Sequence, residues 1–240
     1  MFFNLSSPSK FQRFSKTIYP WTLYGSILLL IIGLFFSFFL SPPDYLQGES
    51  VRIMYVHVPS AWLSLQIYVL MAICSFISLV YKHSLADIIS RACAPIGATF
   101  TLITLITGSI WGKPTWGTWW VWDARLTSEL ILLFIYIGHM LISVSFDDVR
   151  KGDRNAAILT LVGIVNLPII KWSVDWWNTL HQPASLMKFS APSIDPKMLV
   201  PLLIMAFSFF LFFVSIMLVR VSSEILIRKI EILKMNKNKY

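Results

Sequence analysis

The chain has 240 residues, of which 56% are hydrophobic and only 13% are charged. A soluble globular domain carries nearer a quarter charged residues, so the composition excludes that class and predicts an integral membrane protein. The net charge of +8 does not indicate a nucleic-acid partner, because the basic residues lie beside apolar runs and therefore suit lipid headgroups.

Six apolar segments are long enough to cross a bilayer as helices. We therefore expect an all-α fold, a single membrane domain formed by a bundle of six transmembrane helices. The expected spans are residues 21–41, 60–81, 92–111, 127–146, 155–171 and 198–220. The fifth span is short and carries Asn166 and Pro168 near its end, which predicts a break or a kink there.

Basic residues set the expected orientation. Lys and Arg are concentrated in the N-terminal segment, in the second and fourth connectors and in the C-terminal tail. Since basic residues favour the cytoplasmic side, we expect both termini in the cytoplasm. The connectors 42–59, 112–126 and 172–197 would then lie at the outer surface.

The second of these outer connectors is rich in tryptophan. Residues 111–127, with the sequence WGKPTWGTWWVWDARLT, contain five Trp residues. An aromatic belt at the membrane interface is the ordinary explanation for such residues, and we keep it for Trp21 and Trp62. A belt should occupy both membrane faces, however, and here most Trp residues fall on one. The cluster therefore predicts a platform for a large, flat ligand.

Two histidines share the outer side with this platform, His57 just before the second span and His181 in the third outer connector. Imidazole is a common axial ligand of haem iron, and a porphyrin stacks on aromatic rings. We therefore expect the two histidines to bind haem iron from opposite faces. Arg52 and Arg125 are candidates for the two propionates, and Asp123 for orienting Arg125 or an indole N–H.

Three segments resemble a known family. WGTWWVWDARLTSEL (116–130) resembles the W-G-x-x-W-x-W-D signature of membrane haem-handling proteins. YVHVP (55–59) and WWNTLHQ (176–182) resemble the two histidine segments of the haem exporter protein C (CcmC) family of cytochrome c maturation. The resemblance covers about residues 43–196, and the signature positions are filled by Trp116, Gly117, Trp120, Trp122 and Asp123.

The resemblance implies a haem-handling subunit, without catalysis of its own, in the bacterial inner membrane. Such proteins bind haem b transiently and without a covalent bond at the periplasmic face, and they present it to the haem chaperone CcmE. They act with the small membrane subunit CcmD and the ABC transporter subunits CcmA and CcmB. By matching position, His57 and His181 are the implied axial ligands.

Two other functions remain open from the residues alone. A membrane permease with an aromatic gate would need charges buried within its spans. Glu129 is expected near the outer interface, and His139 is expected to bond a neighbouring helix. A membrane b-type electron carrier would hold its haem permanently, whereas ligands in connectors favour binding that can be released.

Overall fold

The structure is a computed structural model that describes residues 7–181 and 194–237. Within these residues the regular structure is helical, and no β-strand forms. Six helical segments are long and apolar enough to cross a membrane. They are Pro8–Leu40, Glu49–Tyr81, Ser84–Trp116, Ala124–Val144, Val149–Trp176 and Pro196–Lys234. The prediction of an all-α membrane protein with six transmembrane helices is therefore confirmed.

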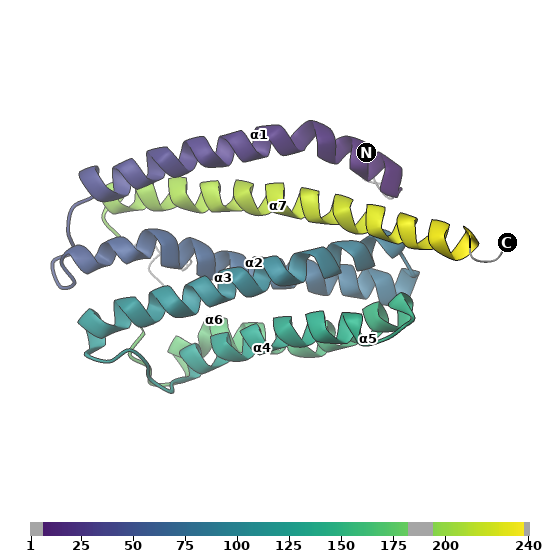
Figure 1. Ribbon diagram of the computed structural model, residues 1–240. Coiled ribbons are helices and arrows are strands. Elements are labelled where there is room, and N and C mark those ends of the chain that lie inside the picture. Colours follow the sequence, from purple (N-terminus) through teal and green to yellow (C-terminus); the bar gives the residue numbers. More distant parts are fainter. Residues whose placement is uncertain (1–6, 182–193, 238–240) are drawn as a thin grey trace.

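The helices run side by side in a bundle (Figure 1). α1 lies against α7 on one side, α2 and α3 are central, and α4, α5 and α6 form the other side. Both described chain ends lie at the same end of the bundle. The bounds are α1 Pro8–Phe35, η2 Phe36–Leu40, η3 Glu49–Ile53, α2 Met54–Tyr81, α3 Ser84–Trp116, α4 Ala124–Val144, α5 Val149–Gly163, α6 Asn166–Trp176 and α7 Pro196–Lys237.

Each helical segment begins before the span expected from hydrophobicity, and α3, α6 and α7 also end beyond it, whereas α4 ends at Val144, two residues short of the expected end. α2 already starts at Met54, so the expectation that His57 lies in a loop is wrong: the histidine is in the first turn of α2. The difference has a physical reason, because residues 54–59 (MYVHVP) are mostly apolar, and a backbone close to hydrocarbon stays helical to satisfy its own hydrogen bonds. His57 is consequently held by a packed helix.

The Trp-rich connector is short because a glycine ends the helix before it and an N-cap residue starts the helix after it. α3 ends at Gly117, whose φ of 78° is the left-handed conformation that glycine adopts without strain. The next helix begins after Asp123, whose Oδ1 accepts a hydrogen bond from the Leu126 N–H at 2.8 Å. The connector is thus limited to residues 117–123, and the residue that follows this cap by two positions is Arg125.

The fifth span is divided into two helices, as the sequence predicts. α5 ends at Gly163 and α6 begins at Asn166. Pro168 falls in the first turn of α6, where the missing N–H leaves no helical hydrogen bond unmade. The Asn166 side-chain amide donates to the Ser128 carbonyl of α4 at 2.8 Å, which ties the start of α6 to its neighbour.

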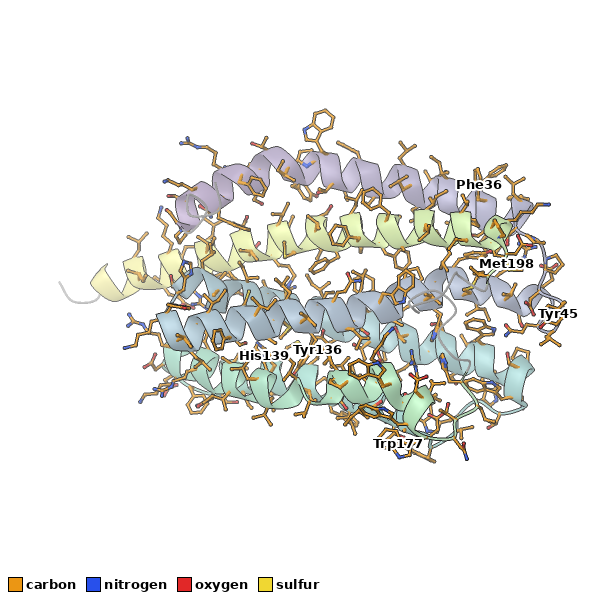
Figure 2. The ribbon with its side chains drawn as sticks, turned by 180° about the vertical axis from the view of Figure 1, so that it is seen from behind. Phe36, Tyr45, Tyr136, His139, Trp177 and Met198 are labelled. Atoms are coloured by element: carbon orange, nitrogen blue, oxygen red, sulfur yellow. The ribbon has the colours of Figure 1, made fainter. Side chains whose placement is uncertain are left out.

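Two buried tyrosines cross the centre of the bundle, where Tyr136 and His139 point between helices (Figure 2). The Tyr136 hydroxyl donates to the Ser64 carbonyl at 2.7 Å, and Tyr68 packs edge-on against Tyr136. A Cβ on Gly97 would lie 2.2 Å from Tyr136 Cζ, so only glycine fits at position 97. His139 Nδ1 lies 2.8 Å from the Thr160 hydroxyl of α5, and its expected bond to a neighbouring helix is confirmed.

Candidate functional site

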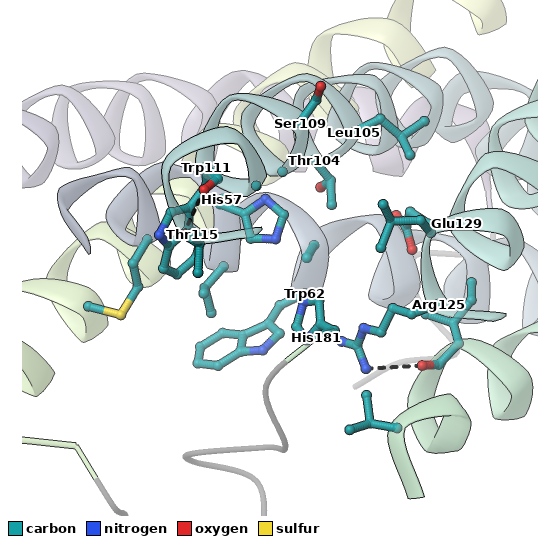
Figure 3. A pocket seen from close by; sticks show the side chains of 18 of the residues that line it. His57, Trp62, Thr104, Leu105, Ser109, Trp111, Thr115, Arg125, Glu129 and His181 are labelled. Carbon is teal, nitrogen blue, oxygen red and sulfur yellow. Dashed lines mark hydrogen bonds between the residues drawn. The ribbon is translucent and has the colours of Figure 1, made fainter. Parts of the chain in front are cut away.

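A pocket of about 330 Å³ lies at the end of the bundle opposite the chain termini, within the range of small-molecule sites. Its walls come from α2, α3, α4 and α6, from the start of α7, from the segment that follows α6, from Trp120 of the Trp-rich connector and from Gln47. Figure 3 shows His57, His181, Trp111 and Arg125 around it. The lining combines aromatic and aliphatic side chains with a small number of polar groups, the usual composition of a ligand site.

His57 is oriented by α3. Its Nδ1 lies 3.0 Å from the Thr107 hydroxyl, which itself donates to the Ile103 carbonyl at 2.6 Å. Because the Thr107 hydrogen is already used, its oxygen accepts the hydrogen of His57 Nδ1. The lone pair is then on Nε2, the nitrogen that can bind a metal. Gly108 leaves room for the ring, since a Cβ there would lie 3.0 Å from His57 Cε1.

His181 reaches the same pocket from a different part of the chain. It follows α6, and its backbone N–H donates to the Thr179 hydroxyl at 2.8 Å. The imidazole ring lies 6.2 Å from the Trp116 ring, while the His57 ring lies 5.6 Å from the Trp111 ring. Two imidazoles from distant segments therefore line one pocket, each next to an indole.

Three further residues expected in the site also line the pocket, namely Trp116, Trp120 and Arg125. The Trp120 Nε1–H is buried and has no hydrogen-bond partner within the described residues. A buried donor without a partner costs about 1–3 kcal/mol, which suits a site that receives a polar ligand group. Arg125 donates from Nη1 to the Ile170 carbonyl of α6 at 3.1 Å, which holds the guanidinium at the pocket wall.

The other expected residues lie outside the lining. Trp122 is 76% exposed, and its ring centroid lies 5.4 Å from that of Trp120. Asp123 caps α4, and its Oδ2 is buried without a hydrogen-bond partner in the described part of the chain. Arg52 pairs with Glu49 and donates to the Ser37 carbonyl. Arg52 is thus held by Glu49 and Ser37 and does not line the pocket of the two histidines.

Several pocket residues were not expected from the sequence. Glu129 is only 6% exposed, and its Oε1 accepts a hydrogen bond from the Ser64 hydroxyl at 2.9 Å. Glu129 lies in the second turn of α4, near the outer end of its span as expected, but its side chain lines the pocket. The spacing to Arg125 could have revealed it, since residues four apart share a helix face. Trp62, expected in an aromatic belt, also lines the pocket together with Gln66.

The donor set suits haem iron better than a bare metal ion. Among residues 7–181 and 194–237, no group of three or more His, Cys, Asp or Glu side chains could hold a metal. A bare zinc site normally uses three or four protein ligands, whereas iron in a porphyrin needs only axial ones. Two imidazoles, aromatic walls, a guanidinium and an unpaired indole N–H fit a planar, anionic porphyrin.

Comparison with known proteins agrees with this description. Residues 1–236 match the family model described as heme exporter protein C. The heme exporter protein C of Bradyrhizobium diazoefficiens is 50% identical over 232 residues, 97% of this chain and 88% of that protein. The Escherichia coli K12 protein of the same name is 48% identical over 223 residues, 93% of this chain and 90% of its own.

A plant relative extends the comparison. A Marchantia polymorpha protein, described as a putative cytochrome c biosynthesis ccmC-like mitochondrial protein, is 51% identical over 182 residues, 76% of this chain and 77% of its own length. The family model and these relatives together cover nearly every residue. The chain therefore belongs to the heme exporter protein C family.

Proposed function

We propose that this protein binds haem b between His57 and His181 and presents it to a haem chaperone during cytochrome c maturation. The observation that carries the proposal is the convergence of these two histidines, from distant segments, on one aromatic pocket. Family membership supports the same function, because the relatives carry the name heme exporter protein C.

Each pocket residue has a distinct role in this proposal. His57 offers Nε2 to the iron, and Thr107 fixes its tautomer and ring orientation. His181 offers the second imidazole. The indoles of Trp116 and Trp120 stack on the porphyrin, and Arg125 binds a propionate through a charge-assisted hydrogen bond. The bound haem would supply its iron and its vinyl edge, while these side chains hold and orient it.

The expected residues outside the lining receive other roles. Asp123 caps α4 and thereby positions Arg125 in the first turn of that helix. The exposed Trp122 indole suits contact with the edge of the ligand or with a partner protein. Because Arg52 is paired with Glu49, we assign the principal propionate contact to Arg125.

The proposal places the pocket at the periplasmic face of the bacterial inner membrane. Both described chain ends lie at the opposite end of the bundle, and the basic residues favour a cytoplasmic location for that end. The partners would be the chaperone CcmE, the small subunit CcmD and the transporter subunits CcmA and CcmB. Hydrolysis of ATP would belong to the transporter, which makes this chain a haem-handling subunit rather than an enzyme.

The test is the haem content and absorption spectrum of the purified protein and its histidine variants. We expect His57→Ala and His181→Ala each to lower haem content and to change the spectrum, because each removes one iron ligand. His83→Ala is the matched control, since His83 lies in the connector between α2 and α3, outside the pocket. Parental haem content and spectrum in both pocket variants would contradict the proposal.

A handover assay separates this function from the alternatives. When apo-CcmE is added to the haem-loaded protein, we expect haem to move to the chaperone. A b-type electron carrier would keep its haem under these conditions. A permease would instead show substrate flux through this protein alone.

A further inference from the structure

A second hollow lies beside the pocket, between α2 and α7. It has a volume of about 290 Å³ and is lined by Pro59, Trp62, Leu63 and Gln66 of α2 and by Leu203, Ala206, Phe207 and Phe210 of α7. Leu203, Phe207 and Phe210 are about half exposed and belong to a membrane-spanning segment whose most apolar 18-residue stretch has a mean hydropathy of 2.8. This lateral groove therefore faces lipid chains rather than water.

The lateral groove and the histidine pocket adjoin. Trp62 and Gln66 line both hollows, and their spacing of four residues places them on one face of α2. On the opposite wall, Leu202 lines the pocket and its neighbour Leu203 lines the groove. Figure 3 shows Trp62 in the same pocket as His57 and His181. Trp62 and Gln66 of α2 thus separate the lipid-facing groove from the proposed haem site.

Gln66 is the polar residue of the two that separate the groove from the pocket. Its side chain is exposed within an apolar membrane-spanning helix, and it makes no hydrogen bond to any described residue. An amide left unpaired in hydrocarbon is costly, so such a group needs a polar partner. A ligand with an apolar body and a carboxylate provides one. An acyl chain alone does not, because it has no hydrogen-bonding group at this depth.

We propose that haem enters the pocket sideways, from the bilayer leaflet at the pocket end of the bundle, through the groove between α2 and α7. The flat apolar body passes the groove residues, and the Gln66 amide donates to a propionate as the ligand passes from the groove into the pocket. Trp62 separates the groove from the two histidines and packs against the ligand once it is inside. This inference rests on the proposed haem-binding function and adds the route by which the site is filled.

The test uses a substitution that blocks the groove but leaves the pocket lining unchanged. Ala206 lines the groove and is absent from the pocket lining, so Ala206→Trp places a large ring in the path, and Ala206→Leu is a milder version. Val219→Trp is the matched control, because Val219 is a lipid-exposed position of the same helix that lines neither hollow. The full chain is placed in phosphatidylcholine nanodiscs. Haem is then supplied either dissolved in the bilayer or as an aqueous complex with albumin.

We expect Ala206→Trp to slow loading from the bilayer about tenfold and Ala206→Leu to slow it less. The final haem spectrum should stay unchanged, because the histidines are intact, and Val219→Trp should load like the parent. The route is wrong if Ala206→Trp loads from the bilayer at the parental rate, or if the parent loads faster from albumin than from the bilayer at equal total haem.

Two further outcomes are informative. A lower final haem content in Ala206→Trp alone would make the groove part of the binding wall and would overturn its role as an entrance. If the parent acquires no haem spectrum from either source, the haem-binding function itself fails, and the route fails with it.

Discussion

Replacing Thr107 by valine tests whether the orientation of His57 matters for haem binding. The Thr107 oxygen accepts from His57 Nδ1 at 3.0 Å, and its own hydrogen goes to the Ile103 carbonyl. Valine has nearly the same shape but no acceptor. A buried N–H that loses its acceptor costs about 1–3 kcal/mol. Without Thr107, His57 no longer favours the tautomer with its hydrogen on Nδ1, and in the other tautomer the hydrogen on Nε2 prevents that nitrogen from binding iron.

The expected result of Thr107→Val is haem affinity lower by about 10- to 100-fold, the usual effect of removing the partner of a metal-binding histidine. Affinity is measured by titrating the purified protein with haem and following the Soret band. The spectrum at saturation should remain that of the parent, because both imidazoles are present. Thr107→Ser should restore affinity, since serine keeps the hydroxyl.

The matched control for this experiment is Thr99→Val. Thr99 lies on the same helix, is exposed, and donates to the Pro95 carbonyl in the same way, but it is absent from the pocket lining. We expect its affinity to equal that of the parent. If Thr107→Val also binds haem like the parent, the assignment of Nε2 as the iron ligand through this hydrogen bond is refuted.

Two other variants test the packing that positions the site. Gly97→Ala should lower the free energy of unfolding by about 1–3 kcal/mol, because a Cβ would lie 2.2 Å from Tyr136 Cζ. Thermal unfolding measures this change. Gly25→Ala is the control and should change stability little, because a Cβ there would meet only the flexible Leu211 side chain at 3.3 Å. Asp123→Ala should cost about 0.5–2 kcal/mol through the lost cap of α4 and should weaken haem binding through Arg125, whereas Asp123→Ser should retain both. A parental melting curve and haem titration for Asp123→Ala would show that the cap does not position the site.

The parts of the fold that depend on hydrophobicity could be predicted from the sequence. Long apolar runs specify the six spans, because a membrane helix needs little else, and Asn166 with Pro168 marked the break between α5 and α6. The helix ends could not be predicted in the same way. They depend on backbone hydrogen bonding, which extends α2 back to Met54 and so includes His57 in the helix.

The candidate site was predictable where residue type alone carries the chemistry. His57, His181, Trp116, Trp120 and Arg125 line one pocket, as the sequence indicated. The remaining wall residues could not be predicted, because they depend on how each helix is rotated about its own axis. That rotation brings the side chains of Glu129 and Trp62 into the pocket wall. Arg52 shows the opposite case. A competing carboxylate three residues earlier, Glu49, lies within reach along the chain and takes the guanidinium.

The break between α5 and α6 has a mechanical consequence for the two histidines. His57 belongs to α2, whose long contact with α3 makes it part of the packed interior. His181 instead follows α6, a helix of only 11 residues. Two described hydrogen bonds join α4 and α6: Arg125 donates to the Ile170 carbonyl, and the Asn166 amide donates to the Ser128 carbonyl. The position of His181 therefore depends on the orientation of this short helix, and a rotation of α6 would change the separation of the two imidazoles.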